Sequence, residues 1–177
     1  MRVTPGRLHG LLVIEPDVFR DERGFFVETF SRARLPETGI NLDFVQDNHS
    51  RSVRDTVRGL HFQAGAGQAK LVRVARGRVW DVAVDIRRDS PTFGQWEAYE
   101  LDDEANRQLF VPVGFAHGFC AISDLADVCY KVSAPYDAAL ERGVRWDDPR
   151  IGISWPTSHP RLSDRDRNNP RLEEAIA

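Results

Sequence analysis

The feature that most constrains the fold is a series of short apolar segments that are broken by turn-forming residues before they reach helix length. Segments 70–75 and 79–86 are rich in valine and alanine, and Arg76 and Gly77 between them have the composition of a turn. Two such runs joined by a glycine-containing turn are typical of an antiparallel β-hairpin. The sequence therefore predicts that these two segments pair with each other.

Further short strands are expected along most of the chain, separated by glycine, proline, asparagine or aspartate. Helices are expected only as one short helix over 31–38, a turn at 104–107 and a fraying tail at 172–177. Many short strands at close spacing are typical of a sandwich or barrel, so the predicted fold class is all-β. The further expected strands are 8–14, 25–30, 93–101, 108–111, 118–121 and 126–132.

Length and charge limit the organisation and the partners of the chain. Its 177 residues suffice for one buried core and are few for two, so a single domain over residues 1–177 is expected. Within it, 146–177 is expected to wrap over the domain as an irregular segment, because 146–170 is rich in proline, aspartate, serine and asparagine. The formal charge of −3 lacks the basic excess typical of proteins that bind nucleic acids or anionic membranes.

The cysteines and the amino terminus bear on the cellular compartment. Two cysteines, Cys120 and Cys129, are too few for a disulfide framework or a zinc site, so both are expected to be buried free thiols. The first residues contain no apolar run of signal-peptide length, and no segment approaches the roughly 20 apolar residues of a membrane helix. We therefore expect a cytoplasmic protein.

Two histidines lie in segments that could bring them to one site. His61 lies in the run RGLHFQ and His117 in the run PVGFAH. Such a pair is typical of a metal site or an acid–base pair, although ordinary hydrogen-bonded histidines are commoner. Gln63 shares a strand face with His61, and its amide oxygen is a poor substitute for imidazole on a transition metal, which disfavours metal catalysis. Without a metal, His61 is better placed as a general base, because its ordinary pKa is about 6.5.

Several other ionisable residues have a functional and a structural interpretation. Asp164 and Asp166 are candidate carboxylates to orient a histidine, although acidic residues in such segments are usually solvated. The expected hairpin would place Lys70 on the face shared by Asp81 and Asp85, where it could hold negative charge developing on an oxygen. The alternative is a lysine on an outward or edge face, where it limits aggregation and Asp81 is only its surface partner.

One tyrosine and two arginines complete the candidates. Tyr130 can donate a proton only where its phenolate is stabilised, and a buried tyrosine that only packs is commoner. Arg23 and Arg58 could clamp phosphates through their planar guanidinium groups, although each alone is more often a surface charge.

Seven spaced motifs connect these residues. They are DERGFFVE at 21–28, QDN at 46–48, RGLHFQ at 58–63, QAKLV at 68–72, GFAHGF at 114–119, YK at 130–131 and LSDRD at 162–166. Together they resemble the dTDP-4-dehydrorhamnose 3,5-epimerase family, and the likeness runs over about residues 10–170. The resemblance implies a cupin-type jelly-roll barrel with a few short peripheral helices.

The resemblance also implies a reaction. Such an epimerase converts dTDP-4-dehydro-6-deoxy-D-glucose to dTDP-4-dehydro-L-rhamnose in dTDP-rhamnose biosynthesis. Protons are removed from C3 and C5, which flank the C4 ketone, and are returned from the opposite face. By position, His61 matches the base, Asp166 the acid that orients it, Tyr130 the proton donor and Lys70 the residue that stabilises the enolate oxygen. No metal and no cofactor are implied, and the expected assembly is a homodimer with exchanged strands.

Further positions match contacts with the substrate. Arg23 and Arg58 match a pyrophosphate clamp, and Tyr136 is expected to stack on the thymine ring. Arg165 stands where relatives commonly carry lysine, and because arginine keeps the charge, phosphate binding should survive. The loop at 64–67 looks slightly shorter than usual. The remaining matched positions that contact the nucleotide and sugar are Glu28, Gln46, Asn48, His117 and Glu141.

Three other functions remain open from the sequence. A mono-epimerase of the same family, acting at C3 or C5 only, could keep the same residues. A non-catalytic cupin module that binds a sugar nucleotide would need no proton donor, so the complete set of ionisable residues disfavours it. A metal-dependent cupin isomerase or oxygenase is disfavoured by Gln63.

Overall fold

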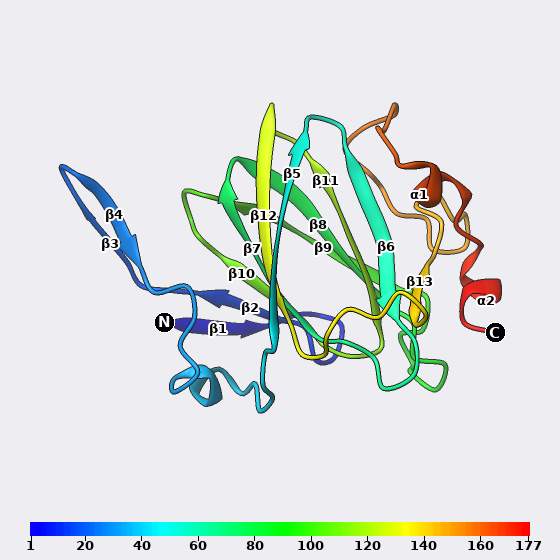
Figure 1. Cartoon of the computed structure of the whole chain (residues 1–177), viewed down its shortest axis with the longest axis horizontal. Helices are drawn as coiled ribbons and strands as arrows, with labels where there is room; N and C mark the ends of the chain where they lie inside the picture. Colours follow the sequence, from blue (N-terminus) through cyan, green and yellow to red (C-terminus); the bar gives the residue numbers. More distant parts are fainter.

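The protein, represented here by a computed structural model that describes residues 1–177, consists mainly of two antiparallel sheets that face each other (Figure 1). The six-stranded sheet has the order β1-β2-β10-β7-β12-β5 and the five-stranded sheet the order β13-β6-β11-β8-β9, while β3 and β4 form a separate hairpin. The predicted all-β class is confirmed. The strands are β1 (Arg2–Pro5), β2 (Leu12–Glu15), β3 (Val18–Asp21), β4 (Gly24–Val27), β5 (Gln46–Val53), β6 (Val57–Gln63), β7 (Lys70–Arg76), β8 (Arg78–Asp85), β9 (Trp96–Asp102), β10 (Gln108–Val111), β11 (Phe115–Ala121), β12 (Leu125–Val132) and β13 (Glu141–Gly143).

The main core lies between the two sheets. Strands alternate their side chains between faces, so the inward positions of both sheets form one apolar layer. Val72 of the six-stranded sheet and Val79 of the five-stranded sheet are both fully buried in it, as are Leu101 and Leu109. This layer holds the sheets together by burying apolar area.

The expected hairpin of 70–75 and 79–86 is wrong, although both segments are strands. β7 pairs with β10 and β12, whereas β8 pairs with β9 and β11, so the two strands lie in different sheets. The turn at Gly77 crosses from one sheet to the other. Gly77 has a φ of 77°, and a Cβ there would lie 2.1 Å from the carbonyl oxygen of Leu125. The apolar pattern identified the strands, but it contains no information on which strands pair.

The outer face of the five-stranded sheet is covered by the end of the chain. Ile151 and Leu172 pack there against Leu60 and Val82. Two short helices, α1 (Asp164–Asn168) and α2 (Leu172–Ala175), lie in this segment. The expected fraying tail is therefore wrong at its first residue, because Leu172 is fully buried.

Other expected elements differ mainly in their bounds. The segment 108–111 coincides with β10, and the helix expected over 31–38 is reduced to a 3-10 helix, η1 (Leu35–Thr38). Four strands were not expected, namely β1, β3, β5 and β13, whereas the strand implied at His61 and Gln63 is β6. Cys120 is a buried free thiol as predicted, whereas the free thiol of Cys129 is only half-buried. None of the helices has the length and apolar character needed to cross a membrane.

Candidate active site

Strands β6 and β11 approach each other closely at a pair of glycines. A Cβ on Gly59 would lie 2.6 Å from the Cα of Gly118, and a Cβ on Gly118 would lie 2.7 Å from the carbonyl oxygen of Arg58. Gly59 also has a φ of 130°, which other residues rarely adopt. Neither position can therefore accept a side chain without moving the strands apart.

The pairing register shifts at this crossing. His61 lies opposite His117 and Arg58 opposite Phe119, so a step of three residues on β6 matches a step of two on β11. This irregularity is a β-bulge, which re-aims side chains. In a regular strand Arg58 and His61 would point to opposite faces. Because of the bulge, Arg58 and His61 instead lie opposite Phe119 and His117, two residues of β11 that share the face directed between the sheets.

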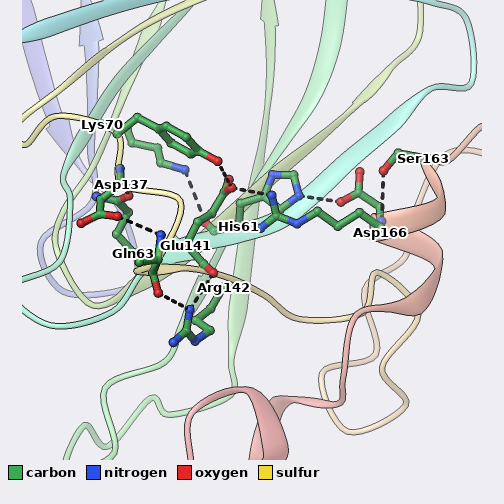
Figure 2. A network of polar contacts seen from close by, with 11 residues as sticks. His61, Gln63, Lys70, Asp137, Glu141, Arg142, Ser163 and Asp166 are labelled. Carbon is green, nitrogen blue, oxygen red and sulfur yellow. Dashed lines mark hydrogen bonds and ion pairs between the residues drawn. The ribbon is translucent and has the colours of Figure 1, made fainter.

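His61 contacts one carboxylate from the C-terminal segment (Figure 2). Its Nε2 lies 2.5 Å from Oδ1 of Asp166, a buried residue of α1. Burial acts to raise the pKa of Asp166, but hydrogen bonds from His61, Ser163 and the backbone of Gly59 outweigh it, so the pKa lies below its ordinary value. Of the two carboxylates considered from the sequence, the structure thus brings Asp166 to His61. Asp164 is exposed.

α1 holds Asp166 in this position although 146–177 was expected to be irregular. Ser163 is the N-cap residue, and its Oγ accepts a hydrogen bond from the backbone N–H of Asp166 at 3.0 Å. The capping residue and the site carboxylate are therefore three positions apart on one turn. The pattern of a serine followed three residues later by an acidic residue was present in the sequence and could have indicated this helix.

Lys70 points into the interior. Only 8% of its surface is exposed, so its alternative interpretation as an outward or edge residue is wrong. Its Nζ donates a hydrogen bond to the carbonyl oxygen of His61 at 3.3 Å. Burial lowers the pKa of Lys70 to about 8, and the negative charges of Asp81 and Glu141 oppose this effect. A buried ammonium with so few acceptors is available to a negatively charged ligand atom.

His117 forms a second histidine–carboxylate pair. Its Nε2 lies 2.8 Å from Oδ1 of Asp81, and both side chains are buried. Sequence reasoning placed Asp81 beside Lys70 but gave it no role in the site. Asp85, which was expected on the same face, instead accepts hydrogen bonds from Arg87, Ser90 and Thr92.

Tyr130 enters the site from the opposite sheet. It belongs to β12, and its side chain packs against the core between the sheets. Burial raises the pKa of Tyr130, the charge of Glu141 adds to this effect, and Arg58 opposes it. His61 and Tyr130 therefore approach the interior from facing sheets. A phenol with a raised pKa is protonated at neutral pH and can donate its proton.

The polar residues of β5 and β6 are connected at the seam between the sheets. Arg58 Nε donates to Oγ of Ser52 at 3.0 Å, and Gln46 Nε2 donates to Oδ1 of Asn48 at 2.8 Å. Gln46 also accepts a hydrogen bond from the backbone N–H of Tyr136 at 2.9 Å. These contacts tie the loop that carries Tyr136 to the sheet edge.

Glu141 joins this loop to the C-terminal segment. It accepts a hydrogen bond from the Tyr136 hydroxyl at 2.7 Å and forms an ion pair with Arg165 of α1. Burial acts to raise the pKa of Glu141, but Arg165, Tyr136 and His61 lower it below its ordinary value. α1 therefore supplies both Asp166 and Arg165 to the site.

Gln63, weighed in the sequence as a poor metal ligand, instead holds the same loop. Its Oε1 accepts from the backbone N–H of Asp137, a residue labelled beside it in Figure 2, at 2.8 Å. Its Nε2 donates to the carbonyl oxygen of Pro135 at 3.2 Å. Nowhere in the chain do three histidine, cysteine, aspartate or glutamate side chains gather in a way that could hold a metal ion.

Two predicted substrate contacts lie away from this cluster. Arg23 is in the turn of the β3–β4 hairpin, where it pairs with Asp21, and Glu28 pairs with Arg34 at 3.0 Å. The hairpin projects from the body of the molecule on the side opposite α1 and β13 (Figure 1). Within one chain, Arg23 and Glu28 are therefore not brought to His61.

The assembled groups suit chemistry beside a carbonyl. An imidazole held by a carboxylate can remove a proton, and a buried ammonium can hold the resulting negative charge. A phenol on the facing sheet can return a proton from the other side. A substrate that used both the imidazole and the phenol would have to lie between the two sheets.

Comparisons with known proteins agree with this chemistry. A sequence model described as dTDP-4-dehydrorhamnose 3,5-epimerase matches residues 5–174. The dTDP-4-dehydrorhamnose 3,5-epimerase of Methanothermobacter thermautotrophicus is 50% identical over 170 residues, covering 94% of this chain and 92% of its own. The dTDP-4-dehydrorhamnose 3-epimerase of Streptomyces niveus is 46% identical over 177 residues, covering 99% of this chain and 86% of its own.

A solved structure matches over nearly the whole fold. The crystal structure of the dTDP-6-deoxy-D-glucose-3,5-epimerase of Legionella pneumophila, in complex with dTDP-4-keto-L-rhamnose, has a TM-score of 0.94 at 44% identity. The match covers 97% of this chain and 93% of that one. The predicted cupin-type jelly roll is confirmed. Sequence and structure together place this chain in the dTDP-4-dehydrorhamnose 3,5-epimerase family.

Proposed function

We propose that this chain converts dTDP-4-dehydro-6-deoxy-D-glucose to dTDP-4-dehydro-L-rhamnose by inverting C3 and C5 in dTDP-rhamnose biosynthesis. The observation that carries the proposal is that the His61–Asp166 pair and Tyr130 come from facing sheets, with buried Lys70 hydrogen-bonded to the backbone of His61. Family membership supports the substrate class.

His61 is the base in this proposal. A carboxylate only accepts hydrogen bonds, so Nε2 of His61 carries the proton that faces Asp166, and the lone pair of Nδ1 is left for the substrate. Nδ1 removes the proton from a carbon beside the C4 ketone, and the electron pair of the broken C–H bond moves onto the C4 oxygen. Asp166 stabilises the imidazolium that results.

Lys70 and Tyr130 complete each inversion. The ammonium of Lys70 holds the enolate oxygen, which carries its full negative charge only after proton removal. Tyr130 then donates its phenolic proton to the carbon from the opposite face, and the carbonyl forms again. Proton exchange with solvent restores both side chains, so the cycle needs no oxidant or reductant.

The nucleotide is held at the seam between the sheets. Arg58 contacts the pyrophosphate, and Arg165 adds a second positive charge on α1. Tyr136 stacks on the thymine, while His117 contacts the sugar. The further residues assigned to the nucleotide and sugar are Gln46, Asn48 and Glu141, which the hydrogen bonds described above connect to the same loop.

We also propose a homodimer, in which Arg23 and Glu28 of each chain serve the site of its partner. The hairpin that carries Arg23 exposes 65% of Phe19 and 70% of Phe26, and such apolar exposure favours burial against another surface. Light scattering should give twice the chain mass, and Arg23→Ala should raise KM while leaving the mass unchanged. A cytoplasmic location is also part of the proposal and is tested by cell fractionation.

The second candidate is a mono-epimerase. It is favoured by one observation, the 46% identity to a dTDP-4-dehydrorhamnose 3-epimerase over the whole chain. Proton NMR in heavy water distinguishes the two, because each carbon that is processed exchanges its hydrogen for deuterium. Exchange at both C3 and C5, with dTDP-rhamnose formed when a coupling reductase is added, supports the double epimerase. Exchange at one carbon only would replace it by the mono-epimerase.

Tyr130→Phe separates the two half-steps. The variant keeps His61, so part of the deuterium exchange at the carbons beside the ketone should remain while net inversion falls. Full inversion by Tyr130→Phe would contradict the role of Tyr130 as proton donor.

A further inference from the structure

β8 carries two fully buried carboxylates on one face, Asp81 and Asp85, and they differ in the number of hydrogen bonds that they accept. Asp85 receives hydrogen bonds from Arg87, Ser90 and Thr92. Asp81, four residues earlier, has a partner only at Oδ1, from His117 at 2.8 Å, and its Oδ2 is buried without any hydrogen-bond donor. An unsatisfied buried carboxylate oxygen is costly, so its presence calls for a functional or structural cause.

The charged groups around Lys70 suggest that cause. Asp81 of β8 and Glu141 of β13 both act on Lys70 electrostatically, yet neither carboxylate lies within ion-pair distance of its Nζ. The other ionisable side chains of the site on neighbouring strands are His61 and Arg58 of β6, His117 of β11 and Tyr130 of β12. Lys70 donates only to the carbonyl oxygen of His61. Its ammonium is therefore supported by negative charge while most of its N–H donors stay free.

We propose that Asp81 is a positioning residue for the epimerisation, which orients the His117 ring through Nε2 and supports the charged form of Lys70 without taking up its hydrogen-bond donors. A direct Lys70–Asp81 ion pair would neutralise the ammonium before the substrate arrived. Because Asp81 does not pair directly with Lys70, the N–H groups of the ammonium remain free to donate hydrogen bonds to the negatively charged enolate oxygen. The inference rests on the proposed function, because it uses the role of Lys70 assigned there.

Asp81→Asn tests the inference, because asparagine keeps the shape and an acceptor for His117 but removes the charge. The affinity for dTDP should stay within about twofold, and kcat should fall by roughly 10- to 100-fold, the lower range for a group that assists acid–base chemistry. In the wild type we expect kcat/KM to fall on the alkaline side near the pKa of Lys70, about 8, and in Asp81→Asn this fall should begin at lower pH.

Asp85→Asn is the matched control on the same strand and face. It removes a carboxylate whose hydrogen bonds are all made within the fold, so it should lower the thermal stability. The pH at which kcat/KM falls on the alkaline side should stay the same as in the wild type. If Asp81→Asn does not fold, Asp81→Thr removes the same charge with a residue that suits a strand. The alkaline limb is a readout that a purely structural role of Asp81 would not move.

The outcomes separate this inference from the proposed function. Wild-type protein that fails to wash deuterium into the substrate overturns the proposed function and the inference with it. Wild-type exchange together with an unshifted alkaline limb and unchanged kcat in Asp81→Asn overturns the inference alone, and Asp81 is then only a packing residue.

Discussion

The space between the two sheets is built in two opposite ways. One part is an apolar layer in which Leu101, Leu109 and Val128 are fully buried, each side chain contributing about 1.5–3 kcal/mol of stabilisation. The other part buries the charged or polar side chains of Lys70 and Asp81 with incomplete hydrogen bonding. The polar part costs stability, because its charged groups are buried for their role in the reaction. The protein can carry this cost because the apolar part supplies enough stabilisation of the fold.

The largest expected effect comes from breaking the polar part at the His61–Asp166 pair. His61→Ala and Asp166→Asn should each lower deuterium exchange beside the ketone by roughly 10²–10⁴-fold, the range for loss of general-base catalysis. Proton NMR in heavy water measures the exchange rate, and calorimetric titration with dTDP shows whether the nucleotide still binds. Wild-type exchange rates in either variant would contradict the assigned roles.

Breaking the apolar part should have the reverse signature. Leu109→Ala should lower the free energy of unfolding by about 2–5 kcal/mol, because it removes buried methyl groups and leaves a cavity. Urea denaturation followed by circular dichroism measures the change. Activity per folded molecule should match the wild type at low temperature. A selective loss of activity without a loss of stability would show that the two parts are not separate.

Lys70→Met sharpens the comparison because stability and activity should move in opposite directions. Burial lowers the pKa of Lys70 from 10.5 to about 8, so the charged lysine costs the folded state about 3 kcal/mol at neutral pH. The variant should be more stable by up to this amount below pH 8. The advantage should shrink as pH rises from about 8 to 10.5, since the wild-type lysine then becomes neutral in the folded state.

Two measurements check this prediction. Urea denaturation at pH 7 and pH 10 gives the stability difference, and the coupled assay gives the rate, which should fall strongly in Lys70→Met. A variant that is less stable than the wild type at pH 7 would contradict the view that buried charge weakens this part of the interior.

The smallest effect is expected at the rim of the polar part. Arg165→Lys keeps the positive charge on α1 but loses the planar group that pairs with Glu141. Exposed ion pairs contribute about 0–1 kcal/mol, so KM should change by less than about fivefold while kcat stays constant. Steady-state kinetics decide, and a large fall in kcat would mean that Arg165 acts on the position of Asp166 as well.

The sequence predicted the class of fold better than its connections. Apolar runs such as 70–75 and 79–86 identified strands, because alternation and β-branched residues are local properties. They could not show that β7 and β8 belong to different sheets, since pairing depends on the whole topology. β5 was missed for a different reason. Its sequence QDNHSRSV has almost no apolar residues, because both of its faces carry polar groups.

The candidate site was predicted through motifs rather than through spacing. His61 and Asp166 are 105 residues apart, so their contact could be expected only from the family resemblance. The buried position of Lys70 was one of two interpretations, and its contact with the backbone of His61 required the fold. The role of Asp81 in the site was not predicted, because an aspartate in a strand is usually a surface residue and the sequence does not show what surrounds it. Arg23 was predicted by its motif, but one chain does not bring it to the site.

The contact between Gly59 and Gly118 has a consequence for protein engineering. Because neither position tolerates even a methyl group, the spacing of the two histidine-bearing strands cannot be adjusted by point substitution there. Attempts to redirect this enzyme to a differently shaped sugar have more freedom in 133–140, where Tyr136 is held by side chains rather than by strand pairing. Libraries that randomise this loop and leave the crossing untouched should retain the largest share of folded members.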